Sequence, residues 1–364
     1  MLAARLSALT ATGSENEGQE LKEILGEIAL LPASSVVRAG REIAISARLA
    51  WPELPRQVTT GIWAHLRQLL WARPEPRRQS AGDPSFQLDI LKTNSDYAWL
   101  FLFYPNGYLR EAALNCINAA PQSPFFLTAL ALRLNDWAEP VRHAAKRCIE
   151  RVSPQISTAI AADAAFYLLD RRFVWGRWGD EASSLDPILG RDDVLAALAE
   201  RLRSQADGAM AASLRHLLRY PGSEDHLPML AARAVQPLVR AVAYQSLITG
   251  KASWRVGYKW IWDDKAYGVK SLIPNFETRT IKRERSPLDY IAEGICDKSA
   301  FVRKTVADAV ITVRRELPIE EGVITILTKD RNAAVRSRAD FMLRHPVQNG
   351  SHQVNQLTKP DNQT

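Results

Sequence analysis

The residues of this 364-residue chain best suited to binding chemistry are large aromatic and basic side chains gathered between Lys251 and Ser286. Trp254, Tyr258 and Trp262 are spaced four residues apart, which would place their side chains on one face of a helix. A basic run follows them and comprises Arg279, Lys282, Arg283 and Arg285. Tryptophan, tyrosine and arginine dominate the binding energy of many protein interfaces. We therefore predict a partner-binding surface here; the alternatives are that the aromatic stripe belongs to the core and that the basic run is a solvated loop.

A second aromatic and basic cluster consists of Trp175, Arg177 and Trp178. It interrupts its surroundings with glycines and large side chains, so we predict a long loop that contributes to the same binding surface. Carboxylates also lie nearby, namely Asp170, Asp180 and Glu181. An acid beside tryptophans can stabilise an oxocarbenium-like centre, so a catalytic role for this cluster is the alternative hypothesis.

The sequence motifs of common enzyme and metal sites are missing. There is no GxGxxG or GxxxxGK[ST] phosphate loop, no HExxH and no GxSxG. The three cysteines form no CxxC pair, and an odd, sparse set indicates a reducing compartment. The sequence contains no run of 18 apolar residues, so no membrane-spanning helix is predicted. We therefore expect no catalytic residues, no metal and no cofactor in a cytoplasmic protein.

A repeated pattern, Asp-x-x-x-x-Val-Arg followed by alanine, must position these clusters. Its clearest copies begin at Asp136, Asp297 and Asp330. Partial copies are Leu109-Arg110, Val239-Arg240 and Asp264 to Val269-Lys270. The basic positions are 110, 142, 240, 270, 303 and 336, with steps of 32, 98, 30, 33 and 33 residues. The long step is close to three periods, so the pattern predicts a stacked array with two degenerate units inside that step.

The best copy, from Asn135 to Ala145, resembles a HEAT repeat, and the resemblance covers residues 86 to 345. It implies that the aspartate lies in the turn between two helices and that Val-Arg opens the second helix. It also implies a ladder of aspartates and arginines from neighbouring units. The predicted fold class is all-α, a right-handed α-solenoid of HEAT-like helix-turn-helix repeats.

The spacing of apolar residues agrees with a helix after Pro140. A single stripe is formed by Val141, Ala145, Cys148, Ile149 and Val152. One such stripe needs neighbouring helices to cover it. No extended alternation of period two was identified, so negligible strand content is expected.

Composition divides the chain into three parts. Residues 1–85 are predicted to be a helical cap or degenerate repeats, with helices over 18–31, 34–50 and 56–72 and a Pro-rich hinge. Residues 86–345 form the repeat array. Residues 346–364 are rich in Gln and Asn and are predicted to be a disordered tail.

A net charge of +7 permits a nucleic-acid partner, but basic residues do not recur at equivalent helix positions. The helix after Arg142 offers Lys146 and Arg147, whereas the helix after Arg240 offers Tyr244 and Gln245. The preferred hypothesis is therefore a non-catalytic scaffold that binds another protein, as a subunit of a larger assembly. The alternative is a nucleic-acid binder, including an enzyme similar to the HEAT-like alkylpurine DNA glycosylases. A chromophore-attaching helper, known among HEAT-like proteins, has only the fold in its favour.

Overall fold

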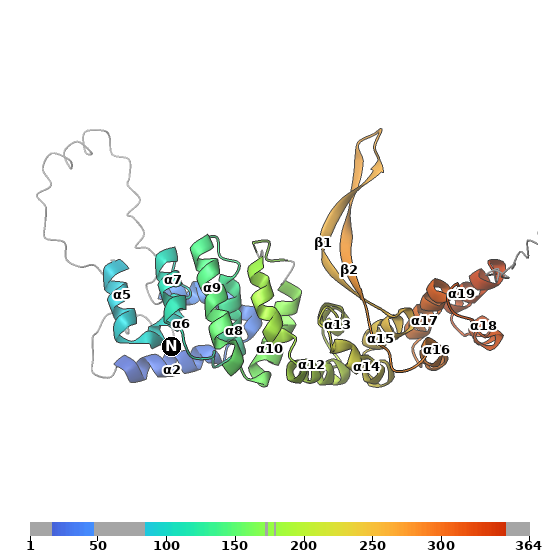
Figure 1. Cartoon of the computed structure of the whole chain (residues 1–364), viewed down its shortest axis with the longest axis horizontal. Coiled ribbons are helices and arrows are strands. Elements are labelled where there is room, and N and C mark those ends of the chain that lie inside the picture. Colours follow the sequence, from blue (N-terminus) through green and yellow to red (C-terminus); the bar gives the residue numbers. More distant parts are fainter. Residues whose placement is uncertain (1–16, 47–83, 172–173, 178–179, 347–364) are drawn as a thin grey trace, which may run out of the picture. The chain divides into compact units, whose positions relative to one another are not determined.

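The computed structural model describes residues 17–46, 84–171, 174–177 and 180–346. Most of them are helical, and they include one two-stranded β-hairpin (Figure 1). The chain divides into two compact units, treated separately below. The first comprises the described residues up to 202 with 212–226 and 253–278; the second comprises 203–211, 227–252 and those from 279 onward. The predicted helix over 56–72, residues 47–50 of the predicted helix 34–50, the Pro-rich hinge as far as residue 83 and the polar tail after Pro346 lie outside the described residues. The hinge was predicted to extend to Phe86, but the chain is helical from Pro84.

Apart from residues 253–278, which belong to the hairpin, the elements of the first unit are helices. Its elements up to residue 171 are α2 (Glu17–Ala29), η1 (Ala33–Ser35), α3 (Val36–Ser46), α5 (Pro84–Thr93), η2 (Ser95–Tyr97), α6 (Ala98–Phe101), α7 (Gly107–Cys116), α8 (Pro124–Arg133), α9 (Glu139–Val152), η3 (Ser153–Gln155) and α10 (Thr158–Arg171). They are followed by η4 (Asp180–Leu185), α11 (Asp186–Leu189), α12 (Asp192–Ser204), α13 (Met210–Leu217) and η5 (Ser223–His226). The last residues of α12, 203–204, and the first residues of α13, 210–211, belong to the second unit. The predicted helices 18–31 and 34–50 correspond to α2 and to η1 with α3.

Local sequence explains where the helices of the array begin. The side chain of Ser123 accepts the backbone N–H of Phe126 ahead of α8, and Pro124 occupies the first turn, where its missing N–H costs little. Asn106 caps α7 in the same way through the N–H of Tyr108. Helix α9 packs against both α7 and α8. All members of its predicted apolar stripe, from Val141 to Val152, are buried, which confirms that stripe.

The second unit is built from helix pairs. Its helices are α14 (Leu227–Arg233), α15 (Pro237–Thr249), α16 (Pro287–Gly294), α17 (Ala300–Val313), α18 (Glu321–Thr328) and α19 (Ala333–Arg344). Consecutive members pack as α14 with α15, α16 with α17 and α18 with α19. Helix α17 also packs against α15 and α19, so the second helices of successive pairs form a contiguous row.

The predicted arginine and aspartate ladder is confirmed in both units. The Nε and Nη2 of Arg110 donate to the two carboxylate oxygens of Asp136 at 2.9 and 2.7 Å. The same paired bonds join Arg240 to Asp297 at 2.7 and 2.9 Å and Arg303 to Asp330 at 2.5 and 2.9 Å. In each case an arginine in the second helix of one helix pair bonds an aspartate in the turn of the next helix pair.

Each ladder arginine also closes the turn that precedes it. Nη1 of Arg110 donates to the carbonyls of Tyr104 and Pro105, six and five residues earlier. Equivalent bonds recur at Arg240, Arg303 and Arg336. Each aspartate in turn accepts the backbone N–H two residues later, as Asp297 does from Ser299 at 2.7 Å. Arg142 closes its turn through a bond to the carbonyl of Asp136 at 3.1 Å, but its carboxylate partner is Glu181, at 3.2 Å.

The prediction of negligible strand content is wrong. Strands β1 (Lys251–Asp264) and β2 (Val269–Thr280) form a hairpin where helical repeats were expected. The copy from Asp264 to Lys270 is therefore not a repeat unit. Asp264 instead organises the turn, because its Oδ1 accepts the N–H groups of Ala266 and Tyr267 at 2.8 and 3.2 Å.

Candidate functional site

The hairpin is inserted between two helices that a ladder pair holds together. The sequence separation of Arg240 and Asp297 is 57 residues, compared with 26 and 27 for the other two pairs, an excess of about 30 residues. At the neck, Gly250 ends α15 in the left-handed conformation, with φ of 68°, and its carbonyl accepts the N–H of Ile281 at 3.0 Å. The chain thus leaves and re-enters the second unit at adjacent backbone positions, so the ladder does not require the hairpin.

One face of the hairpin carries large apolar side chains. Alternate residues of a strand share a face, and the Nζ of Lys270 lies 3.9 Å from the ring centroid of Trp262, which places the even-numbered residues of both strands together. We call this surface the aromatic face; its members are Tyr258, Trp260, Trp262, Lys270, Leu272 and Phe276. Its five large apolar side chains are between 48% and 66% exposed. Exposed apolar patches are typical of interaction sites.

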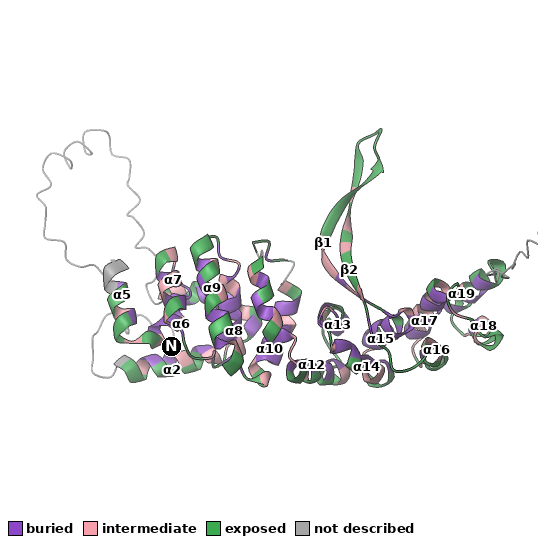
Figure 2. Ribbon diagram, in the orientation of Figure 1, coloured by how far each residue is buried: buried purple, intermediate pink, exposed green. Residues whose placement is uncertain are grey.

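Burial on the hairpin runs against the usual pattern, in which the apolar face of a sheet is covered. The odd-numbered residues Ser271, Ile273 and Asn275 are half-buried, whereas Leu272 and Phe276 on the aromatic face are exposed. Figure 2 shows the distal part of both strands as exposed, in contrast to the buried interiors of the helices. Each strand pairs only with the other among the described residues. An isolated hairpin has marginal stability in water, so an additional partner would stabilise it.

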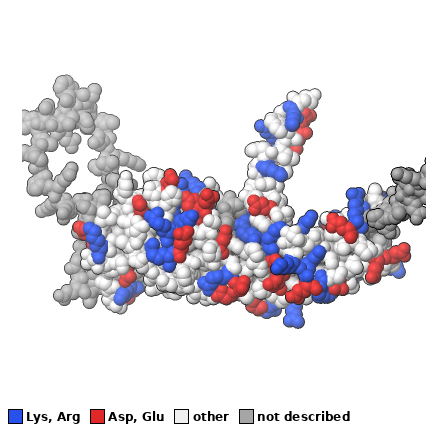
Figure 3. Space-filling model, in the orientation of Figure 1, with Lys and Arg blue, Asp and Glu red and all other residues white. Residues whose placement is uncertain are grey.

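Basic groups orient the rings of the hairpin. The guanidinium of Arg255 lies 5.3 Å from the ring centroid of Tyr258, and its Nη1 donates to the tyrosine hydroxyl at 3.0 Å. The ammonium group of Lys270 likewise lies over the ring of Trp262. Cation–π contacts of this kind hold aromatic side chains in defined positions before binding. Acidic residues accompany the basic ones, and Figure 3 shows charges of both signs rather than a continuous basic stripe on the face in view.

Two of the predicted site tryptophans belong to the interior. Trp254 at the base of β1 and Trp175 are each only 9% exposed, and the ring of Trp175 packs edge-on against Tyr167 with centroids 6.1 Å apart. The prediction that these two residues belong to an exposed binding surface is therefore wrong, because both are buried in the core. Arg177 is exposed, and its backbone N–H donates to Asn135 at 3.0 Å. Trp178 lies outside the described residues.

The basic run is divided between strand and loop. Arg279 belongs to β2 and is half-buried, so this part of the expected loop is a strand, while Lys282 is exposed. The Nη1 of Arg283 donates to the carbonyls of Leu247 and Ile248 at 3.1 Å each, which satisfies acceptors at the end of α15. Arg285 bonds Glu293 at 2.8 Å, and this bond raises the pKa of the Arg285 guanidinium. Arg283 and Arg285 therefore hold the neck of the hairpin to the helices beside it.

The sequence argument identified the segment but not its most exposed members. Of the predicted aromatics, Tyr258 is exposed and lies on the aromatic face. Trp260, Trp262, Leu272 and Phe276 were not among the predicted site residues. The missed signal was the alternation of Trp254, Val256, Tyr258, Trp260 and Trp262, because a period of two with aromatic and β-branched residues indicates a strand.

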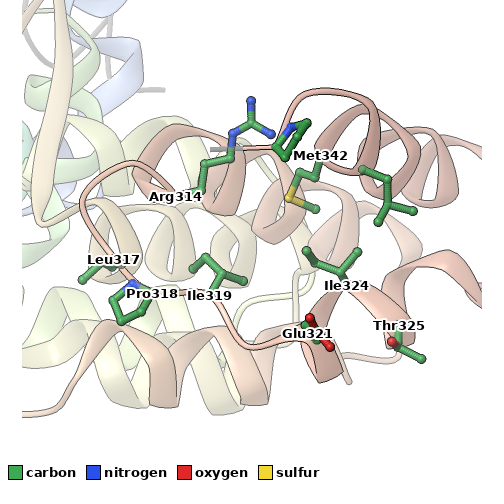
Figure 4. A pocket seen from close by; sticks show the side chains of 10 residues that line it. Arg314, Leu317, Pro318, Ile319, Glu321, Ile324, Thr325 and Met342 are labelled. Atoms are coloured by element: carbon green, nitrogen blue, oxygen red, sulfur yellow. The ribbon is translucent and has the colours of Figure 1, made fainter. Parts of the chain in front are cut away.

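A hollow of about 510 Å³ lies where the ends of α17, α18 and α19 meet (Figure 4). Its walls are mainly aliphatic, with Leu317, Ile319, Ile324 and Met342, and Arg314 stands at its rim. The guanidinium of Arg314 lies 5.1 Å from the ring centroid of Phe341. Glu321 and Thr325 supply its polar lining.

In the described part of the chain, no group of three or more metal-ligating side chains comes together. No helix there has the length and apolar character needed to cross a bilayer. Comparison with known proteins gives no match to any family, curated protein or solved structure.

Proposed function

We propose that this chain is a non-catalytic scaffold that binds another protein through the aromatic face of its hairpin, as a subunit of a larger assembly. The observation that carries the proposal is the exposure of five large apolar side chains on an insertion that the ladder does not need. Aromatic residues at the centre of an interface and charged residues around it are typical of protein recognition.

The helical part of the proposal is a HEAT-like right-handed α-solenoid. It is supported by the paired helices of the second unit, by the contiguous row of α15, α17 and α19, and by ladder bonds that recur with the same geometry. Stacked repeats of this kind are rigid along the chain because each contacts its neighbours. Such a body suits a subunit that presents a binding arm.

Nucleic-acid binding is the second candidate function. The observation in its favour is the close pairing of Lys270 with the ring of Trp262, because stacked aromatics beside basic groups also suit single-stranded nucleic acids. The glycosylase version gains no support from the geometry. Trp175 is buried, and Glu181 accepts a bond from Arg142.

Affinity purification from the native cell, with and without nuclease, tests the proposal with three baits. These are the wild-type protein, the double variant Trp260→Ala/Trp262→Ala, and a deletion of residues 251–280 that joins Gly250 to Ile281 through glycines. We expect the wild type to retain specific proteins after nuclease treatment and both variants to lose them. Loss of all partners on nuclease treatment would favour a nucleic-acid ligand, and equal capture by all three baits would exclude the hairpin.

A matched control separates the hairpin from exposed aromatics in general. Phe301 is 48% exposed on α17, as exposed as Trp262, and lies outside the hairpin. Phe301→Ala should capture the same proteins as the wild type. Melting temperatures of all the baits show whether each variant is folded.

A further inference from the structure

A second exposed aromatic surface lies in the first unit, at the starts of α7 and α9. There the helices border a hollow of about 740 Å³, within the range of roughly 300–1,000 Å³ typical of ligand sites. Its lining includes two prolines, Pro105 and Pro140, and two aromatic residues, Tyr108 and Trp137. Two carboxylates, Glu111 and Glu139, also line it. Nothing in the hairpin contributes to this lining, so the hollow is a separate surface.

The two rings are unusually exposed for their size. Tyr108 in the first turn of α7 is 81% exposed, and Trp137 in the turn before α9 is 70% exposed. Tyr108 and Glu111 are three residues apart on α7, so they lie on the same side of that helix. Trp137 and Glu139 approach from the following turn and the first residue of α9. An aromatic and an acidic residue therefore come from each of two neighbouring repeat units.

The ladder fixes this hollow in place. Arg110 on α7 bonds Asp136, the residue directly before Trp137, and the pair is buried. Asn106 accepts the N–H of Tyr108 at 2.9 Å, and Asp136 accepts that of Ala138 at 3.1 Å. These bonds hold both turns and occupy N–H groups that an anion would otherwise bind at the helix starts. The hollow is thus preorganised.

We propose that this hollow binds a proline-rich segment of another protein that carries an arginine. A polyproline II helix is already extended, and it docks on surfaces made of exposed aromatic rings at little conformational cost. Tyr108 and Trp137 supply such rings, with Pro105 and Pro140 beside them.

The arginine of the ligand is inferred from charge. Glu111 and Glu139 line the hollow of a chain whose net charge is +7, so the site has the opposite sign to the molecule as a whole. A guanidinium can stack on an aromatic ring and bond a carboxylate in the same geometry, which an ammonium group cannot do as well. The Nε2 of His143 lies 3.9 Å from the Glu139 carboxylate. The carboxylate of Glu111 forms no ion pair within the described residues.

This site goes beyond the proposed function, because it shares no residue with the aromatic face. Binding is measured by fluorescence polarisation of a short synthetic proline-rich peptide with one terminal arginine. We expect saturable binding to the wild-type protein and at least about tenfold weaker binding to Trp137→Ala, since truncating an anchoring tryptophan typically costs that much or more. Tyr108→Ala provides a second variant in case Trp137→Ala is unstable, and Glu111→Gln/Glu139→Gln tests the charges.

The controls separate this site from the rest of the molecule. Phe301 lies two residues before Arg303, as Tyr108 lies two before Arg110, but it does not line the hollow. Phe301→Ala and Trp260→Ala/Trp262→Ala should both bind the peptide like the wild type. A hairpin variant that loses its protein partners but binds the peptide normally would show that the two surfaces are separate. A Trp137 variant that binds the peptide weakly but keeps the protein partners would show the same.

Several outcomes would overturn the assignment. One is the absence of saturable binding to the folded wild-type protein; another is equal affinity for the wild type and for both aromatic variants. A peptide with alanine in place of every proline should bind more weakly, and so should one with glutamate in place of arginine. Equal binding of either peptide contradicts the proposal. Tighter binding of a trimethyl-lysine peptide would assign an ammonium site instead.

Discussion

The turns of the repeat and the hairpin use the same kinds of side chain in opposite ways. In the turns, arginines such as Arg240 are buried, and their donors meet a carboxylate and two backbone carbonyls. On the hairpin, Lys270 and the rings of Trp260 and Trp262 remain exposed. Satisfied and buried groups stabilise the fold, whereas exposed groups of the same chemistry remain available for a partner. Residue type alone therefore does not distinguish a structural arginine or tryptophan from a binding one.

The largest effect should come from breaking a buried ladder bond. Arg240→Ala leaves Asp297 buried and without its guanidinium partner, and removing one member of such a pair costs about 3–5 kcal/mol. Urea unfolding followed by circular dichroism measures the loss. Arg110→Ala should cost less, because Arg133 still bonds Asp136 at 3.0 Å. Arg285→Ala, which removes a half-exposed pair, is the control and should change stability much less. Equal losses for Arg240 and Arg285 would contradict the structural role of the ladder.

A pH-dependent effect should follow from a buried histidine in the helical body. Burial and, to a smaller extent, the positive charge of Arg219 lower the pKa of His216 to about 4. In the unfolded chain the group titrates near pH 6.5, so the unfolded state binds more protons between that value and about 4. Stability should therefore fall as the pH falls through this window, by on the order of 2 kcal/mol. Melting temperatures across pH should show a shallower slope for His216→Gln, and an unchanged slope would contradict this origin.

A smaller loss is expected at the last arginine of the ladder. Arg336 donates to the carbonyls of Asp330 and Arg331 at 2.7 and 3.0 Å, but no carboxylate of the described residues pairs with it. Arg336→Ala should cost about 1 kcal/mol, the contribution of an ordinary hydrogen bond. Urea unfolding provides the measurement. A loss as large as that of Arg240→Ala would show that Arg336 has a carboxylate partner beyond the described residues.

The smallest change in stability should come from the aromatic face. Trp260→Ala/Trp262→Ala removes two large rings, yet the free energy of unfolding should stay within about 0.5 kcal/mol, because surface substitutions remove few packed contacts. The same variant should lose the protein partner. A clear fall in melting temperature would show that these rings pack against the protein itself.

The ladder could be expected because the recurring Asp-x-x-x-x-Val-Arg pattern resembles a HEAT repeat, and that resemblance implies the pairing. Asp136, Asp297 and Asp330 each precede a Val-Arg pair by the same number of residues, and the structure pairs each of them with an arginine. The bond from Arg142 to Glu181 was not predicted, because the degenerate unit that follows lacks the aspartate. In that unit a carboxylate from a different position takes the role.

The hairpin could not be separated from a helix by the feature that was used. A spacing of four between Trp254 and Tyr258 places both residues on one side of a helix, but it also places them on one side of a strand. The full alternation from Trp254 to Trp262 would have resolved this ambiguity. Exposure was harder to predict, since Trp254 near the neck is covered and Trp260 farther along is not. That difference depends on what packs beside the base of the hairpin, which periodicity does not encode.

The bond between Gly250 and Ile281 has an evolutionary consequence. Because the backbone positions on either side of the hairpin are already adjacent, the intervening 30 residues could be gained or lost in a single genetic event without shifting the register of α15 and α16. Variation in binding preference could then be confined to this one segment while the helical body is conserved. The same neck is a natural graft point, where an arm with a different recognition surface could be installed on the same body.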